Sequence, residues 1–104
     1  MYQSKYKIKE QILEKLTEEK PYLALKYHLS ELGLFGSAAR GDDTLLSDID
    51  VLFNVEENKS FSLFDMVDLK DYLEKKLGKT VDIVDKKMLK PALRARILQE
   101  VVMI

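Results

Sequence analysis

Residues 34–55 read LFGSAARGDDTLLSDIDVLFNV, and two features of this stretch decide the fold. In its second half, apolar and polar residues alternate, which is typical of a strand with one buried face. Asp48 and Asp50 share the other face of that strand. Two charged carboxylates this close repel each other, and a bound divalent cation would remove that cost. The sequence therefore predicts a strand over 49–55 with a metal site at its start.

The first half of the stretch predicts an anion-binding turn. A short apolar strand over 32–35 runs directly into Gly36 and Ser37. Glycine lets a backbone approach a ligand closely, and a serine that begins a helical turn offers its hydroxyl beside free N–H groups. Ten residues separate Ser37 from Asp48, enough for about one helical turn and a loop back to a neighbouring strand. We therefore expect a phosphate-binding turn to face the metal site.

A third carboxylate is expected from a later strand, over residues 80–85. Val81 and Ile83 would face the core there, and Asp82 would face the opposite side. Asp85 would share the face of Val81 and Ile83, so it is not the candidate. Magnesium prefers a few carboxylates plus phosphate oxygens, and two such ions can stabilise both the attacking and the leaving oxygen of an in-line displacement. This set of residue types suits nucleotidyl transfer from a nucleoside triphosphate.

The spacing of these residues resembles a known signature. Gly36-Ser37, the ten-residue gap, Asp48-x-Asp50 and the later Asp82 resemble the DNA polymerase β-type nucleotidyltransferase superfamily. Gly-Ser and Asp-x-Asp at one fixed separation would arise by chance in roughly one chain of this size per thousand. More narrowly, the short chain with Gly-Ser-Ala-Ala-Arg-Gly resembles the minimal nucleotidyltransferases, which are antitoxins encoded beside HEPN-domain ribonuclease toxins.

The resemblance implies a fold and a set of roles. The fold is α/β (of the α+β kind), a small mixed sheet flanked by helices, and the activity is Mg²⁺-dependent transfer of AMP from ATP to a tyrosine of the partner toxin. Asp48 and Asp50 would hold two magnesium ions. Asp82 would hold one of them and help to deprotonate or orient the acceptor hydroxyl. Gly36 and Ser37 would grip the β- and γ-phosphates.

Arg40 is a further candidate for phosphate binding. It lies three residues after Ser37, near the expected triphosphate oxygens, and guanidinium binds phosphate in a fork geometry. Its role would be to bind phosphate or to position the partner. The simpler alternative is a surface salt bridge to Asp42 or Asp43.

Composition narrows the remaining classes of function. The 104 residues predict a single domain over 1–104 with one modest core. The formal net charge of −1, with acids and bases interspersed, gives no reason to expect nucleic-acid or membrane binding. The chain has no cysteine, no apolar stretch long enough to span a bilayer and no apolar signal core at its start. We therefore expect a cytoplasmic protein.

Helices are expected around these strands. Apolar spacing predicts one over about 5–19, interrupted at Pro21 and restarting over 21–27. Ser62 and Asp65 form a capping-box pattern that opens a helix to about residue 77, and we expect one face of that helix to be buried. A last helix is expected from Pro91 to the end of the chain. The residues expected on the buried face of the 63–77 helix are Leu63, Met66, Val67, Leu73 and Leu77.

Two other functions remain open. A binding module could neutralise its partner by covering it, and the apolar C-terminal end of the chain favours that reading. Retention of three mutually repelling acids disfavours it. Transfer to a small molecule is the other alternative, but the chain has no room for a second domain to enclose a small acceptor.

Overall fold

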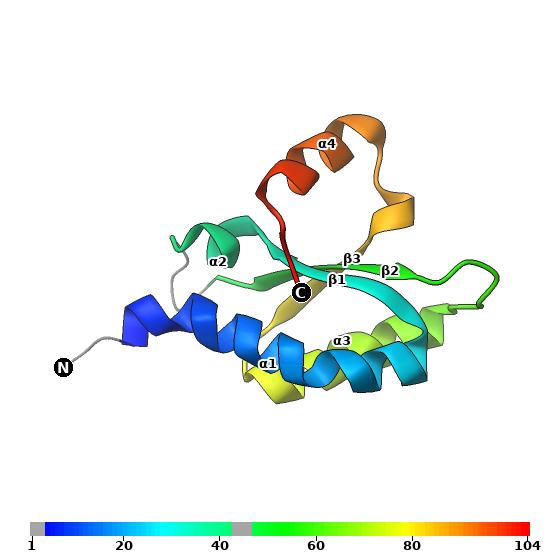
Figure 1. Cartoon of the computed structure of the whole chain (residues 1–104), viewed down its shortest axis with the longest axis horizontal. Helices are drawn as coiled ribbons and strands as arrows, with labels where there is room; N and C mark the ends of the chain where they lie inside the picture. The colour runs from blue at the N-terminus through cyan, green and yellow to red at the C-terminus, as the bar shows by residue number, and fades with distance from the viewer. Residues whose placement is uncertain (1–3, 43–46) are drawn as a thin grey trace.

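The computed structural model describes residues 4–42 and 47–104, and Figure 1 shows its elements. In chain order they are α1 (Ser4–Tyr27), β1 (Leu29–Phe35), α2 (Gly36–Arg40), β2 (Ile49–Val55), α3 (Leu63–Leu77), β3 (Val81–Asp85), the 3-10 helix η1 (Lys86–Met88), α4 (Pro91–Glu100) and β4 (Val102–Met103).

The four strands form one mixed sheet in the order β3-β2-β1-β4. β1 runs antiparallel to both β2 and β4, and β2 runs parallel to β3. A parallel pair needs a long crossover connection, which α3 supplies between β2 and β3. The expected fold class, a small mixed sheet flanked by helices, is therefore confirmed.

The two faces of the sheet are covered unequally. α1 and α3 lie side by side against one face, and α4 stands on the other (Figure 1). Strand residues such as Val51 and Phe53, both 0% exposed, form the main core under α1 and α3. Among the described residues, the buried cluster on the α4 face is small and consists of Phe35, Leu52 and Ile97. The main core thus fixes the sheet, and the α4 face is left partly open.

α3 begins and ends as the sequence predicts, but its buried face differs. The side chain of Ser62 accepts a hydrogen bond from the Asp65 N–H, and the Asp65 carboxylate accepts one from the Ser62 N–H. Gly78 ends the helix in the left-handed conformation. Leu63 and Val67, expected in the core, are 83% and 69% exposed. Their expected burial is wrong because Leu63 and Val67 lie on a different side of the helix from the residues that pack on the core, which are Met66, Leu69, Leu73 and Leu77.

The predicted interruption at Pro21 is also wrong. α1 runs through Pro21 as one 24-residue helix, although proline cannot donate to the carbonyl of Thr17 four residues earlier. Leu16 and Leu23, on either side of Pro21, are both 0% exposed, so packing of both halves on the sheet outweighs the missing hydrogen bond. Across the described ranges, no helix combines the length and apolarity needed to cross a membrane.

The C-terminal segment differs from the expected continuous helix. Pro91 occupies the first turn of α4 as predicted, but the helix ends at Glu100 and β4 then pairs with β1. The N–H of Ile104 donates to the carbonyl of Leu32 at 2.8 Å. A Cβ on Gly33 would lie 2.7 Å from Val101 Cγ2, so the absence of a side chain at residue 33 lets the chain end close onto β1. Sheet pairing therefore overrides the local helical pattern.

Replacing Pro21 by alanine should stabilise the protein. Alanine restores the hydrogen bond to Thr17 and removes the clash of the proline ring, so the free energy of unfolding should rise by roughly 1–3 kcal/mol. Urea unfolding followed by circular dichroism measures the change. Glu18→Ala, at an exposed position of the same helix, should change stability by less than about 0.5 kcal/mol. A loss of stability in Pro21→Ala would mean that the helix needs its proline.

Candidate active site

Gly36 stands where β1 turns into α2, and its conformation requires glycine. Its φ is +76°, in the left-handed region. A Cβ at this position would lie 2.1 Å from Oδ2 of Asp50 and 3.0 Å from its Cγ. The backbone of the turn therefore lies directly against the Asp50 carboxylate.

α2 holds Ser37 beside that contact. The helix is only five residues long, and its N-cap residue Phe35 makes no side-chain hydrogen bond to the first turn. Ala38 and Ala39 are buried and fix the helix to the sheet, while Ser37 remains half-buried. Ser37 thus lies in a first turn whose backbone N–H groups are not capped by the N-cap side chain.

Strand register sets the positions of the three aspartates. Asp50 is the second residue of β2 and is paired with Phe35 of β1 on one side and with Asp82 of β3 on the other. Partners in a register point to the same face of the sheet. Leu52, two residues after Asp50, packs with Ile97 of α4. Asp50 and Asp82 therefore lie side by side on the α4 face, beyond the end of that apolar cluster.

Asp48 lies just before β2, and the exposure of the three acids differs. Asp48 and Asp82 are exposed, whereas Asp50 is half-buried. Burial raises the pKa of Asp50 above its ordinary value of 3.8, and the negative charges of Asp82, Asp48 and Glu100 raise it further. Arg40 acts in the opposite direction. All these groups are therefore close enough to Asp50 to act on its charge.

The donor set fits magnesium bound together with a nucleotide. Among residues 4–42 and 47–104, no three histidine, cysteine, aspartate or glutamate side chains are grouped closely enough to hold a metal ion by themselves. Mutual repulsion keeps carboxylates apart when no cation lies between them. Carboxylate oxygens without sulfur or nitrogen donors suit magnesium, which commonly takes one or two carboxylates and completes its shell with phosphate oxygens and water.

Arg40 forms the surface salt bridge to Asp42 that the simpler hypothesis predicted, and it forms a second salt bridge to Glu100. Its Nε donates to Oδ2 of Asp42 at 3.2 Å, and its Nη1 donates to Oε2 of Glu100 at 3.0 Å. Asp43, the other expected partner, lies outside the described residues. Sequence reasoning missed Glu100, because nothing local marks a residue 60 positions away as a partner of Arg40.

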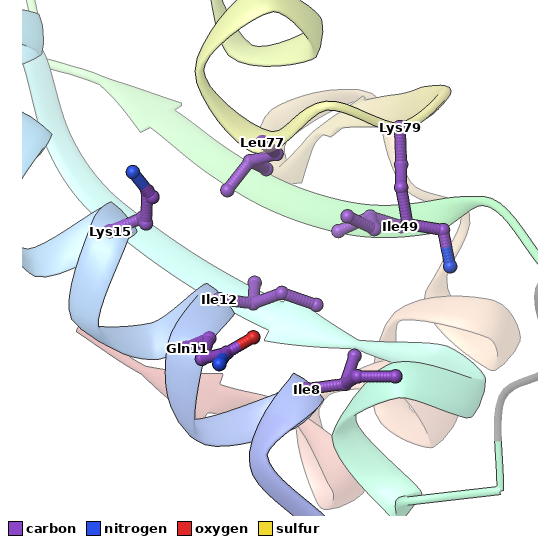
Figure 2. A pocket seen from close by; sticks show the side chains of 7 residues that line it. All are labelled: Ile8, Gln11, Ile12, Lys15, Ile49, Leu77 and Lys79. Atoms are coloured by element: carbon purple, nitrogen blue, oxygen red, sulfur yellow. The ribbon is translucent and has the colours of Figure 1, made fainter. Parts of the chain in front are cut away.

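A separate pocket lies on the other face of the sheet. It has a volume of about 190 Å³ and lies between α1 and the end of α3 (Figure 2). Ile49 contributes to its wall, and Ile49 points away from the face that carries Asp50 because side chains alternate along β2. The pocket is therefore not the site of the three aspartates. Its other lining residues include Ile8, Ile12, Lys15, Leu77 and Lys79.

Sequence comparisons connect this arrangement to known proteins. A family model described as a nucleotidyltransferase domain matches residues 9–104. The protein adenylyltransferase MntA of Thermococcus cleftensis is 40% identical over 93 residues, which cover 89% of this chain and 92% of the relative. A provisionally named protein adenylyltransferase of Methanocaldococcus jannaschii is 43% identical over 77 residues, or 74% of this chain and 77% of the relative.

Solved structures share the same fold. A provisionally named minimal nucleotidyltransferase superposes with a TM-score of 0.74 at 36% identity, covering 88% of this chain and 92% of that one. A chain from a toxin–antitoxin crystal structure with AMP-PNP superposes with a TM-score of 0.66 at 22% identity, covering 91% of this chain and 70% of that one. At that identity, the second likeness establishes the fold only.

Replacing Asp50 by asparagine should stabilise the protein at neutral pH. The raised pKa means that the folded state holds the proton of Asp50 more tightly than the unfolded chain does, so folding stability falls as pH rises above 3.8 through the raised pKa. Asparagine does not titrate and escapes this loss. Urea unfolding should therefore show a gain for Asp50→Asn at about pH 7 that disappears below the unfolded pKa.

The control is Asp71→Asn, an exposed acid on α3 that pairs with Lys75. It should give no comparable gain at neutral pH. A pH-independent difference between wild type and Asp50→Asn would contradict the electrostatic account of Asp50.

Replacing Gly36 by alanine should cost more stability than replacing Gly78. Both glycines have positive φ, at +76° and +70°, but nothing lies within 4 Å of a Cβ on Gly78. Gly78→Ala should therefore lose only the backbone preference, about 1 kcal/mol, and Gly36→Ala about 1–2 kcal/mol more for displacing the Asp50 carboxylate. Removing that carboxylate in a Gly36→Ala, Asp50→Ala double variant should recover the difference. Equal losses for both single variants would show that Asp50 does not lie against the turn.

Proposed function

Because this chain belongs to the nucleotidyltransferase domain family, we propose that it transfers AMP from ATP to a tyrosine of a HEPN-domain ribonuclease toxin and thereby acts as its antitoxin. The observation that carries this proposal is the register that sets Asp50 and Asp82 side by side, with the Gly36 turn against Asp50. The names of the relatives support a protein acceptor, since two of them are called protein adenylyltransferases. We further propose that residues 1–104 form a single minimal domain that acts in the cytoplasm, where ATP is available.

In this proposal the turn binds the triphosphate. Gly36 lets the backbone approach the β- and γ-phosphates, Ser37 contributes its hydroxyl and first-turn N–H groups, and Arg40 adds a positive fork at the rim. These contacts orient the α-phosphate toward the aspartates and leave the pyrophosphate end of the nucleotide anchored on α2. Anchoring of this kind lowers the barrier by holding the reacting groups in line.

The aspartates supply the second half of the site. Asp48 and Asp50 would hold two magnesium ions and Asp82 one of them, and these ions would neutralise charge on the attacking and leaving oxygens. Burial, and then the negative charges of Asp82, Asp48 and Glu100, disfavour the charged form of Asp50 and raise its pKa, so a bound cation would relieve this cost. Asp82 lies on the edge strand β3 and is exposed, so it can receive an acceptor hydroxyl that approaches from outside.

The reaction is an in-line displacement at the α-phosphorus. The tyrosine hydroxyl oxygen forms a new bond to this phosphorus while its proton passes to Asp82 or to water. The bond from the α-phosphorus to the bridging oxygen of the β-phosphate breaks, and pyrophosphate leaves with that oxygen. The acceptor ends as an AMP–tyrosine phosphodiester.

A second candidate function is neutralisation by binding alone. On α4, Leu93 and Leu98 are 46% and 39% exposed. On the opposite face of the sheet, neighbouring side chains at the start of α3 are also exposed, namely Leu63 (83%), Phe64 (87%) and Val67 (69%). Apolar side chains gathered in this way are typical of contact surfaces. In this reading the chain covers the toxin, and the nucleotide site is not needed.

One experiment separates these functions. The protein is incubated with ATP, magnesium and the short helical protein encoded by the neighbouring gene if that protein carries an arginine followed within several residues by histidine. Intact-mass spectrometry should then find one or more added AMP groups on that protein, and peptide mapping should place them on tyrosine. Omission of magnesium should abolish the addition. Tight binding without added mass would select the second candidate.

Asp48→Asn and Asp50→Asn should each reduce AMP transfer by at least about 100-fold, the scale on which loss of a group that stabilises transition-state charge is felt. Both variants should remain folded, because neither side chain contributes to the main core. Asp71→Asn removes an exposed acid from α3 and should transfer AMP at the wild-type rate. Unchanged labelling by Asp50→Asn would refute the assigned role.

A further inference from the structure

Arg40 is held by carboxylates from two different parts of the chain. Asp42 lies just after α2 and engages Nε, while Glu100 at the end of α4 engages Nη1 with Oε2 at 3.0 Å and Oε1 at 3.4 Å. These contacts engage two of the three guanidinium nitrogens, Nε and Nη1. Two anchored nitrogens fix the plane of a guanidinium, because its donors form a rigid fork.

Glu100 is a firm anchor because its backbone is fixed on both sides. One turn earlier, Ile97 packs against Phe35 and Leu52. Directly after it, the Val101 N–H donates to the Ile97 carbonyl at 2.9 Å, and β4 then pairs with β1. Phe35 is the residue before Gly36, so the last turn of α4 and the glycine turn are attached to the same point of the sheet.

The position of the pair relative to the aspartates gives it a second effect. Glu100 and Arg40 both act on the charge of Asp50, with opposite signs. The Glu100 side chain is 26% exposed and the Arg40 side chain 51%, so this ion pair is only partly screened by solvent. The pair therefore places the oriented guanidinium of Arg40 near Asp50, while the carboxylate of Glu100 is bound to that guanidinium.

We propose that Glu100 is a positioning residue for nucleotide binding: it holds the Arg40 guanidinium at the rim of the Gly36 turn so that the Nη2 edge of the fork meets phosphate oxygens. This inference rests on the proposed function only in taking a nucleoside triphosphate as the ligand. Glu100 acts through Arg40 and does not touch the nucleotide itself.

The alternative is that Glu100 competes with phosphate for Arg40, and the two readings predict opposite signs. A positioning carboxylate helps the nucleotide to bind, so its removal weakens binding. A competing carboxylate must be displaced by the nucleotide, so its removal tightens binding. The clamp on two nitrogens of the guanidinium favours positioning.

The test is a double-mutant cycle on nucleotide affinity. Isothermal titration calorimetry with AMP-PNP and magnesium is performed on wild type, Glu100→Ala, Arg40→Ala and the double variant. Glu100→Ala should weaken binding about three- to five-fold, the size of effect that a partly exposed ion pair carries. In the Arg40→Ala background the same change should cause no further loss, because Glu100 then has nothing to position.

Matched variants separate positioning from a structural role. Glu100→Gln keeps the shape and one acceptor oxygen, so it should lose less affinity than Glu100→Ala. Asp71→Ala breaks the exposed pair with Lys75 on α3 and should leave AMP-PNP affinity unchanged. Thermal unfolding of every variant identifies any that fails to fold, and Glu100→Gln then carries the test.

Two results would overturn the inference: equal losses from Glu100→Ala with and without Arg40, or tighter binding when Glu100 alone is removed. The proposed AMP transfer fails separately. If wild type binds AMP-PNP with the expected coupling but never labels its partner, the positioning role stands and the transfer does not. If wild type labels its partner but the cycle shows no coupling, the AMP transfer stands and the positioning role of Glu100 does not.

Discussion

The in-register pairing of β2 between β1 and β3 is the constraint on which the rest of the structure depends. It brings Phe35, Asp50 and Asp82 into one row across the sheet. A slip of one residue would turn Asp82 toward the main core and Ile83 away from it. Burial of the opposite face, where Val51 is 0% and Ile83 6% exposed, prevents that slip. The apolar residues under α1 and α3 thus determine where the carboxylates lie on the other face.

The candidate site lowers the stability of the fold, and this favours a chemical role for the site. Asp50 is held in a place where its charged form is disfavoured, and Gly36 must accept a left-handed backbone to fit against it. Neither feature helps the chain to fold. A protein that only covered its partner would lose nothing by replacing these residues, whereas a site for cations and phosphate gains from both.

α4 links the site to the exterior of the molecule. It rests on the sheet mainly through Ile97, while Leu93 and Leu98 are 46% and 39% exposed. Its last residue reaches the guanidinium on α2, so this weakly buried helix takes part in the arrangement around Asp50. A protein that contacted α4 would therefore touch an element that is attached, through Arg40, to the helix that follows the Gly36 turn.

The sequence by itself determined the local features of this protein. Alternation of apolar and polar residues predicted strand β2 and the shared face of Asp50 and Asp82. The spacing of Ser62 and Asp65 predicted the start of α3. The spacing of Gly-Ser and Asp-x-Asp indicated the family. These signals hold because they lie within a few residues and depend on backbone geometry. The tertiary structure alone decided that α1 continues through Pro21, that the chain ends as a strand, and that Arg40 meets Glu100. In the first two cases a contact distant in sequence outweighs a local preference, because burial and strand pairing contribute more free energy than the propensity of one residue. In the third, Arg40 keeps its local partner Asp42 and gains Glu100 as well.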